Sequence, residues 1–581
     1  MQKKRPQTLR VSFVALAFTK IAVILSLVTW TSALGQARRA GACFFALILT
    51  SEAFAAETGL SPSGAADTYS NPIIAADFSD PDVIATPTGF WMTASSFNSS
   101  PALPLLFSED LVRWQLVGHA LQRNQPETWF SQPQHGNGVW APCLRFHDGR
   151  FWIFFPDPDH GIWVTSTDDP LGTWSTPRLV LAGQGLIDPT PLWDQDGRAW
   201  LLHGWAKSRA GFNNRLTLHE MAPDASWVAT EGRTLIDGDQ LSDVRTLEGP
   251  KFYYRDGYYW IFAPQGGVTA GTQLVFRSEK LEGPWAYRTV LAQGDTDVNG
   301  PHQGAWVRTS VGEDWFIHFQ SRPPFGRIVH LQPMQWRDQW PVIGSDTDHD
   351  GIGEPVSTWL RPAVSRPTGR STELSDFSAS DDFSSPEWHP AWHWNTNPEV
   401  DWARRRSGRL ILNSQPNGGN LWHQPALLLQ RLPAQSMIAE TVIDVPDRAM
   451  GWRGGLLVYG EDYAWIGLRG GDQGEVMLGI GRCRDARIGC EETFEPLFEV
   501  GEAQVRVRVN VSHLGHYVFS TLINDRWHSV GELMTARNGR WVGAKIGLFA
   551  AHNEGEQSVA LSFDAFGLSP TETASILATP Q

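Results

Sequence analysis

A phrase of about fifty residues recurs five times between residues 71 and 353. Each copy opens on a short polar motif, continues into an apolar strand, turns, and ends in a strand rich in aromatic residues. The copies open at Asp80-Pro81-Asp82, Trp140-Ala141-Pro142, Ile187-Asp188-Pro189, Glu248-Gly249-Pro250 and Gly300-Pro301-His302. Repeats of this length that are built from short strands are typical of a β-propeller with one four-stranded blade per repeat. The sequence therefore predicts five blades over residues 70–355.

The turns inside the repeats carry their own signal. Asp148-Gly149, Asp196-Gly197 and Asp256-Gly257 predict tight hairpins, because an Asp-Gly pair supplies the positive φ that such turns need. We see no amphipathic helix of useful length in the region, which is therefore all-β.

The propeller brings residues together that are distant in the sequence. The innermost strand of each blade lines the central channel, so the residues that open the repeats converge on one channel mouth. Asp80, Asp188, Glu248 and His302 are expected there.

A second all-β region follows the repeats. Residues 356–378 are rich in Pro, Ser, Thr and Arg and are predicted to be a linker. Residues 379–570 contain alternating strands, for example at 410–412 and 436–442, and their strand spacing fits a β-sandwich accessory domain. The predicted fold class is all-β, a five-bladed β-propeller followed by a β-sandwich.

Residues 1–55 have the pattern of an export segment. An apolar run at 40–50 follows Arg38-Arg39 and precedes the A-x-A cleavage site at Ala53-Phe54-Ala55. A second apolar run, at 11–30, is either a membrane anchor or lies upstream of the true translation start, and we favour the later start. Both interpretations export the body of the protein, which is predicted to be secreted or periplasmic.

The cysteines agree with export. Cys483 and Cys490 are close enough in the sequence to bridge a hairpin in an oxidising compartment, and the alternative is two unpaired thiols. Cys143 lies in an apolar stretch and is predicted to be buried and inert.

Composition narrows the range of partners. The formal net charge is −15 and no basic stripe with interleaved aromatic residues is present, which argues against nucleic acid. The chain has 28 Trp against 9 Tyr, a surplus that suits both a packed core and the stacking of sugars on indole rings. A membrane is a partner only if the upstream apolar run is an anchor.

Three of the repeats open on an acidic residue. Glycosidic bonds are commonly cleaved by two carboxyl groups, one of which protonates the leaving oxygen while the other activates water or attacks. A third acid nearby can raise the pKa of the proton donor by like-charge repulsion. Asp80, Asp188 and Glu248 could each be a turn residue alone, but their equivalent positions favour a shared active site.

An ordered set of motifs runs through the repeat region. They are Asn71-Pro72 with Asp80-Pro81-Asp82, residues 93–97, residues 107–111 with Trp114, Val139-Trp140-Ala141-Pro142, Ile187-Asp188-Pro189, Glu248-Gly249-Pro250, and Gly326-Arg327 with residues 330–333. Taken together, they resemble glycoside hydrolase family 43 over the whole propeller. The C-terminal region is similar to the β-sandwich often fused to this family's β-xylosidases and α-L-arabinofuranosidases.

The resemblance implies a role for each acid. Asp80 matches the general base that activates water, Asp188 the modulator that tunes the acid's pKa and orients the substrate, and Glu248 the general acid. The family works by inversion, so the base and the acid should stand roughly 6.5–9.5 Å apart. Glu248 then needs a raised pKa, which the neighbouring Asp188 can provide.

The resemblance also implies the substrate-binding residues. Arg327 matches an arginine that hydrogen-bonds the terminal sugar, and Trp140 and Phe97 look like subsite walls. His302 matches a channel histidine that some members associate with a bound calcium ion. No cofactor is required, and a structural Ca²⁺ in the propeller channel is allowed. Roles as channel filler for His302 and as blade core for Trp140 stay open.

Two acidic clusters need an interpretation. Asp77, Asp80 and Asp82 lie together, and Asp80 is assigned as the base by analogy because it immediately precedes the proline. Residues 346–351 (DTDHDG) resemble a loop of oxygen ligands for calcium. They lie at the end of the propeller and are predicted to form a solvated turn, so no metal ligands are assigned.

The implied activity is an inverting exo-glycoside hydrolase that releases xylose or arabinose, or both, from hemicellulose such as xylan. A sandwich side chain that closes the pocket would favour exo action over an endo-acting arabinanase. Two alternatives remain. One is a retaining fructan-type hydrolase, which usually has Asn-Asp-Pro, Arg-Asp-Pro and Glu-Cys at the acids. The other is a non-catalytic carbohydrate-binding propeller. The sequence does not decide between a xyloside and an arabinofuranoside.

Overall fold

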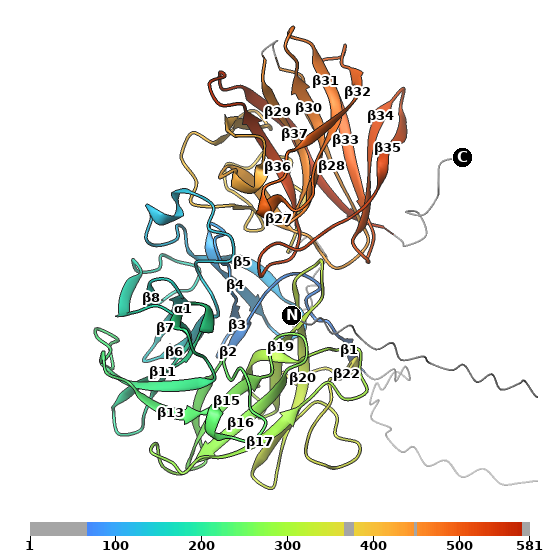
Figure 1. Cartoon of the computed structure of the whole chain (residues 1–581). Helices are drawn as coiled ribbons and strands as arrows, with labels where there is room; N and C mark the ends of the chain where they lie inside the picture. Colours follow the sequence, from blue (N-terminus) through green and yellow to red (C-terminus); the bar gives the residue numbers. More distant parts are fainter. Residues whose placement is uncertain (1–66, 365–376, 447–449, 572–581) are drawn as a thin grey trace, which may run out of the picture. The chain divides into compact units, whose positions relative to one another are not determined.

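A computed structural model describes residues 67–364, 377–446 and 450–571. These residues form a propeller and a C-terminal β-sandwich, both of which can be followed by colour in Figure 1. The predicted all-β fold class is therefore confirmed. The export segment predicted at residues 1–55 lies outside the described residues, as do residues 365–376 of the predicted linker.

The propeller contains five four-stranded antiparallel sheets among the described residues, and the strands of each sheet pair in sequence order. The first two blades are β2 (Asp82–Thr86), β3 (Gly89–Thr93), β4 (Ala102–Ser108) and β5 (Gln115–Leu121), then β6 (Cys143–His147), β7 (Arg150–Asp157), β8 (Gly161–Thr167) and β9 (Arg178–Ala182). The third and fourth are β10 (Leu186–Trp193), β11 (Ala199–Trp205), β12 (Arg215–Met221) and β13 (Arg233–Asp237), then β14 (Lys251–Arg255), β15 (Tyr258–Gln265), β16 (Thr272–Ser278) and β17 (Ala286–Leu291). The fifth is β18 (His302–Arg308), β19 (Asp314–Ser321), β20 (Arg327–Arg337) and β21 (Trp340–Ile343).

The Asp-Gly pairs shape the inner hairpins of the blades. Both residues of Asp148-Gly149 and of Asp256-Gly257 have positive φ, between 50° and 83°, which matches the predicted tight turns. The third pair differs, because only Gly197 has positive φ and a longer loop joins β10 to β11.

Apolar side chains fill the spaces between neighbouring blades. Val83 and Met92 of the first blade share one core with Val307 and Ile317 of the fifth, so the ring closes by packing. Next to this core, β1 (Thr68–Ser70) pairs antiparallel with β22 (Thr358–Leu360), so part of the predicted linker is a strand. The described helices are short: η1 (Trp129–Ser131), α1 (Lys207–Ala210), η2 (Gly238–Gln240), η4 (Leu421–His423) and η5 (Ala486–Ile488).

Two large sheets form the β-sandwich. One has the order β23-β27-β36-β29-β30-β31-β32, with β26 beside β36, and the other has the order β24-β25-β37-β28-β33-β34-β35. The first consists of β23 (His393–Trp394), β26 (Gln415–Pro416), β27 (Leu427–Arg431), β29 (Trp452–Tyr459), β30 (Tyr463–Gly470), β31 (Val476–Cys483), β32 (Thr493–Glu499) and β36 (Lys545–His552). The second consists of β24 (Ala403–Arg405), β25 (Leu410–Asn413), β28 (Met437–Asp444), β33 (Gln504–Val511), β34 (His516–Ile523), β35 (Arg526–Thr535) and β37 (Ala560–Pro570).

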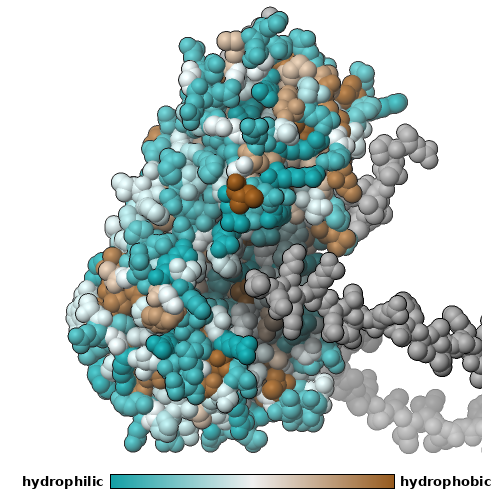
Figure 2. All heavy atoms as spheres, in the orientation of Figure 1, coloured by the Kyte–Doolittle hydropathy of each residue, from teal (hydrophilic) through white to brown (hydrophobic). Residues whose placement is uncertain are grey.

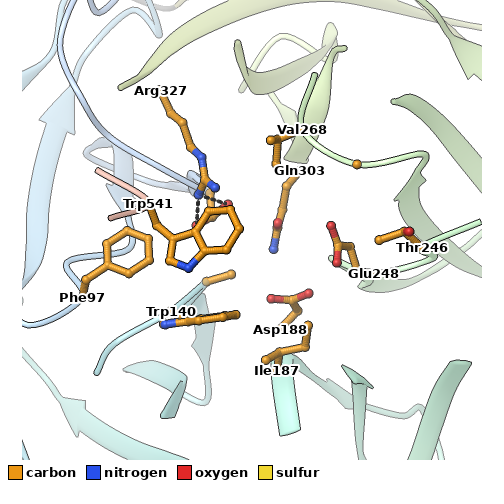
Figure 3. A pocket seen from close by; sticks show the side chains of 13 residues that line it. Phe97, Trp140, Ile187, Asp188, Thr246, Glu248, Val268, Gln303, Arg327 and Trp541 are labelled. Carbon is orange, nitrogen blue, oxygen red and sulfur yellow. Dashed lines mark hydrogen bonds and ion pairs between the residues drawn. The ribbon is translucent and has the colours of Figure 1, made fainter. Parts of the chain in front are cut away.

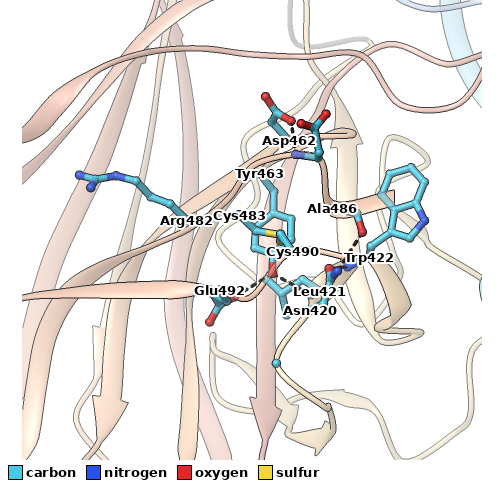
Figure 4. Close-up of a disulfide and its surroundings, with 12 residues drawn as sticks. Asn420, Leu421, Trp422, Asp462, Tyr463, Arg482, Cys483, Ala486, Cys490 and Glu492 are labelled. Atoms are coloured by element: carbon cyan, nitrogen blue, oxygen red, sulfur yellow. Dashed lines mark hydrogen bonds between the residues drawn. A yellow bond between two sulfur atoms is a disulfide. The ribbon is translucent and has the colours of Figure 1, made fainter. Parts of the chain in front are cut away.

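The predicted disulfide between Cys483 and Cys490 is present, with 5.8 Å between the Cα atoms (Figure 4). It ties the segment that contains η5 to the end of β31, beside an apolar cluster that includes Trp465. Glu492, two residues further on, accepts a hydrogen bond from Tyr463 Oη at 3.0 Å. Cys143 is free and buried, as predicted.

The described residues of the two domains belong to one compact unit. Phe325 and Ile328 of the propeller pack into the core of the sandwich. The Asn98 side chain donates a hydrogen bond to the backbone carbonyl of Asn395 at 2.6 Å, and Ser100 pairs with Trp394. The sandwich is therefore in direct contact with the propeller.

Hydrophilic residues cover most of the face shown in Figure 2, and apolar residues are scattered among them. Within the part of the chain that the structure describes, no helix is both long and apolar enough to cross a membrane.

Candidate active site

A pocket of about 260 Å³ lies where the innermost strands of the blades begin. Its lining comes from the loops before β2, β6 and β14, from the β3–β4 and β15–β16 loops, from β10, β18 and β20, and from the sandwich (Figure 3). The lining residues are Asp80, Phe97, Trp140, Ala141, Ile187, Asp188, Thr246, Glu248, Gly267, Val268, Gln303, Arg327 and Trp541. The structure thus brings together six of the seven residues that the sequence singled out.

Asp80 is buried and surrounded by hydrogen-bond donors. Its Oδ2 atom accepts hydrogen bonds from Ser95 Oγ at 2.5 Å and from Ser79 Oγ at 2.8 Å. The Arg327 guanidinium lies 3.4 Å from both carboxylate oxygens and also donates to Ser79 Oγ. Three side chains therefore fix the orientation of this carboxylate.

The neighbouring acids of the cluster do not reach the pocket. Asp82 is fully buried and forms ion pairs with Arg145 at 2.9 Å and with Lys251 at 3.3 Å. Asp77 binds backbone N–H groups on the domain boundary. Of the three, Asp80 alone lines the pocket.

Asp188 lies between Asp80 and Glu248 in sequence order and close to both charges. Its Oδ2 atom accepts a hydrogen bond from the Gly249 N–H at 2.7 Å. Burial raises the pKa of Asp188 to about 7, and the negative charge of Glu248 adds to this effect. The amide of Gln303 points toward Asp188 in Figure 3.

Glu248 is partly open to solvent, with 21% of its side chain exposed. Its Oε1 atom lies 3.0 Å from His302 Nε2. The Gly249 N–H that follows it binds Asp188, so a single loop links these two carboxyl groups. Glu248 combines access to a ligand with a fixed position.

The backbone is strained where side chains turn into the pocket. Five lining residues other than glycine have φ between 40° and 57°: Asp80, Phe97, Asp188, Thr246 and Gln303. Non-glycine residues seldom adopt these angles, and such strain concentrates at functional sites.

Three aromatic rings wall one side of the pocket. Phe97 and Trp140 have ring centroids 6.4 Å apart, and Trp541 lies 6.3 Å from Trp140. The indole N–H of Trp140 donates to the Gly136 carbonyl at 2.9 Å, which holds its ring in place. Trp541 comes from the sandwich and also lies under the Arg327 guanidinium, 5.9 Å from its centre.

The structure corrects the expectation that His302 lines a sugar subsite. His302 is fully buried, does not line the pocket and contacts Glu248. It is the first residue of β18 and pairs with Phe319 of β19. Its Nδ1 atom is buried without a hydrogen-bond partner.

His302 alone does not make a calcium site. Calcium takes six to eight oxygen ligands, whereas His302 offers one nitrogen. Within the described residues, the group of three that could hold a metal is Asp346, Asp348 and Asp350, in the loop predicted to be a solvated turn. Asp346 Oδ2 in that loop pairs with Arg337 at 2.7 Å.

Sequence reasoning missed several lining residues. Gln303 and Thr246 lie within two positions of predicted residues, and the repeat pattern could have indicated them. Trp541 has no such signal, because its position depends on how the sandwich docks. The sequence analysis allows for a sandwich side chain at the pocket but does not identify it.

A five-bladed propeller whose mouth gathers three carboxyl groups, an arginine and aromatic rings defines a class of enzymes that act on carbohydrates. Two family models match this chain: "Glycosyl hydrolases family 43" over residues 69–341 and "Beta xylosidase C-terminal Concanavalin A-like domain" over residues 380–569. The chain belongs to glycosyl hydrolases family 43 and is a glycoside hydrolase, as the sequence predicted.

Curated relatives support the assignment. The chain is 32% identical to a putative beta-xylosidase of Xylanibacter ruminicola, covering 83% of this chain and 86% of that protein. It is 28% identical to a beta-xylosidase of Formosa agariphila, and the alignment covers 88% of this chain and 92% of that protein. It is 26% identical to a non-reducing end alpha-L-arabinofuranosidase of Bacteroides ovatus, and the alignment covers 68% of this chain and 74% of that protein.

Solved structures share the fold. A Bacteroides ovatus protein described as "Xyloglucan PUL GH43B" superposes with a TM-score of 0.75 at 23% identity, covering 87% of this chain and all of that chain. The two-domain arrangement is therefore common to both.

Proposed function

We propose that this enzyme is an inverting exo-glycosidase that releases xylose, arabinose or both from the ends of hemicellulose chains. The observation that carries the proposal is the pocket itself, in which Asp80, Asp188 and Glu248 line a small space that Trp541 of the sandwich also lines. Its volume of about 260 Å³ is below the roughly 300–1,000 Å³ of sites for drug-sized ligands. This size suits a single terminal sugar.

Asp80 is proposed as the general base. A base for inversion must hold a water on the face of the sugar opposite the leaving group and take its proton. Donors from Ser79, Ser95 and Arg327 fix the Asp80 carboxylate in one orientation. Arg327 can also donate to a sugar hydroxyl, since its guanidinium lines the pocket.

Glu248 is proposed as the general acid, with Asp188 as its modulator. Two carboxyl groups in one site resist the loss of both protons because the charges repel each other. Burial raises the pKa of Asp188 to about 7 and the charge of Glu248 adds to the rise, which supports retention of one proton by the pair near neutral pH. Glu248 is the more exposed of the two and is placed to pass a proton to the leaving oxygen.

The choice of sugar rests on the relatives. Two of the three named above are called beta-xylosidases and one an arabinofuranosidase that acts at non-reducing ends. The aromatic wall of Phe97, Trp140 and Trp541 offers flat surfaces for either sugar. Secretion or export to the periplasm belongs to the same proposal and is supported by the Cys483–Cys490 disulfide.

The test measures nitrophenol release from nitrophenyl β-D-xyloside and nitrophenyl α-L-arabinofuranoside. The wild type should hydrolyse at least one of them, and Glu248→Gln should lose about 10²-fold or more in kcat. Glu279→Gln, on the same blade but outside the pocket, is the matched control and should keep full activity. Proton NMR of the first product should show the inverted anomer.

Full activity in Glu248→Gln would show that Glu248 is not the general acid. Retention of the anomer would exclude inversion. Sugar binding without turnover in the wild type would favour a carbohydrate-binding propeller.

A further inference from the structure

One carboxylate outside the pocket holds the backbone of two pocket elements from different domains. Asp77 Oδ1 accepts a hydrogen bond from the Arg327 N–H at 2.8 Å. Asp77 Oδ2 accepts a hydrogen bond from the Gly543 N–H, also at 2.8 Å. Arg327 reaches Asp80 with its side chain, and Gly543 lies two residues after Trp541.

The three segments meet backbone to backbone. A Cβ atom on Gly326, whose φ is 85°, would lie 2.5 Å from Asp77 Cγ. A Cβ atom on Gly543 would lie 2.3 Å from the Phe325 carbonyl oxygen. Ala544 donates a backbone hydrogen bond to the Pro324 carbonyl at 2.7 Å. Glycine at 326 and 543 therefore allows the close approach that brings both N–H groups to Asp77.

The sandwich also fixes Asp77 itself. Arg431 Nε donates to the Asp77 carbonyl at 2.7 Å, and its guanidinium stacks on the Phe78 ring at 4.3 Å. Burial raises the pKa of Asp77, whereas the N–H donors of Arg327 and Gly543 and the charge of Arg431 lower it. The residue is mostly buried, so little water competes for its oxygens.

We propose that Asp77 is a positioning residue that sets Arg327 and Trp541 relative to each other and so completes the sugar pocket across the domain boundary. This inference rests on the proposed function. Arg327 and Trp541 are already in contact through the guanidinium and the indole ring. A shift of about 1 Å in such groups is enough to cost on the order of 10²-fold in rate.

The first experiment compares Asp77→Asn and Asp77→Ala with the wild type on the nitrophenyl glycoside that the wild type prefers. Asn keeps one acceptor oxygen and should lower kcat/KM about tenfold, with KM rising more than kcat falls. Ala removes both acceptors and should lower kcat/KM further. Thr396→Val, which removes a cross-domain hydrogen bond to the Phe130 carbonyl away from the pocket, should leave kcat/KM unchanged.

A double-mutant cycle then tests whether Asp77 acts through Trp541. The loss in Asp77→Asn/Trp541→Ala should be clearly smaller than the product of the two single losses, because the second change removes the group that Asp77 positions. Independent, multiplicative losses would overturn the inference. Full activity in both Asp77 variants would also overturn it.

Amide hydrogen exchange provides a readout that does not depend on turnover. Peptides that contain Arg327 and Gly543 should exchange faster in Asp77→Asn than in the wild type, and Thr396→Val should leave them protected. Unchanged protection at both amides would contradict the proposal even if the wild type hydrolyses none of the glycosides. Inactivity of the wild type with the expected exchange would instead contradict only the proposed function.

Discussion

Burial and the nearby charge of Glu248 raise the pKa of Asp188 from 3.8 to about 7. The folded protein thus binds a proton at Asp188 that the unfolded chain releases near pH 4. Between about pH 4 and pH 7 the folded state holds the extra proton, so this group's contribution to stability falls as the pH rises through that window. Above pH 7, the fold carries a buried charge beside another carboxylate.

Asp188→Asn should therefore stabilise the protein at neutral and alkaline pH while it lowers activity. The amide cannot ionise but can still accept the hydrogen bond from Gly249. The gain at pH 8 should be on the order of 2–4 kcal/mol and should shrink toward zero near pH 4. Thermal unfolding of both proteins from pH 4 to pH 8 measures the gain. A constant difference across that range would show that ionisation of Asp188 is not its cause.

Trp541 closes the pocket from the sandwich side, and its removal should change the choice of substrate. Trp541→Ala should raise KM for the nitrophenyl monosaccharide about tenfold, because the loss of an aromatic contact with the sugar costs roughly 1.4 kcal/mol. Oligosaccharides with a side branch should lose less. Kinetics on an unbranched and a branched xylo-oligosaccharide check this. Equal losses on both would mean that Trp541 binds sugar without restricting access.

At the scale of strands, the pocket depends on how the blades start. Each innermost strand begins next to a residue that faces the pocket, and left-handed backbone angles at Asp80 and Asp188 turn their side chains inward. Asp82 of β2 pairs with Arg145 of β6 and Lys251 of β14. Lys251 is 1% exposed and also donates to the Pro142 carbonyl at 3.0 Å. This ion cluster joins three blades.

Lys251→Met should destabilise the propeller by about 3–5 kcal/mol, because it leaves part of a buried carboxylate uncompensated. Lys251→Met/Asp82→Asn should be less stable than Lys251→Met, because it leaves the Arg145 guanidinium without its carboxylate. Urea denaturation of the three proteins gives the free energies of unfolding. A double variant more stable than Lys251→Met would contradict this account.

The sequence predicted the elements better than it predicted the lining of the pocket. Repeats and Asp-Gly turns are local signals, so the five blades and the hairpin at Asp256-Gly257 could be predicted. Asp80, Asp188 and Glu248 followed from equivalent repeat positions. Trp541 could not be predicted, because no local pattern records where another domain docks. The depth of His302 depends on strand pairing that a motif does not specify.

At the scale of the whole molecule, the boundary between the domains is also a boundary of the pocket. Phe325 and Ile328 belong to the propeller, but their side chains pack in the core of the sandwich. The buried Lys545 ammonium of the sandwich donates to Ser99 Oγ of the propeller at 2.9 Å. The Asn397 side chain donates to the Asn124 carbonyl at 3.0 Å. If the domains separated, these buried groups would lose their hydrogen-bond partners.

The two domains should therefore unfold together. Calorimetry of the chain from about residue 56 should show a single transition, with the calorimetric and van't Hoff enthalpies equal. Activity should disappear within the same temperature interval, because the loss of the sandwich removes Trp541 from the pocket. If instead the sandwich melted first and activity survived it, the shared core would be too weak to couple the domains. The propeller would then bind its sugar without the closing wall, and the exo specificity would have to come from the blades alone.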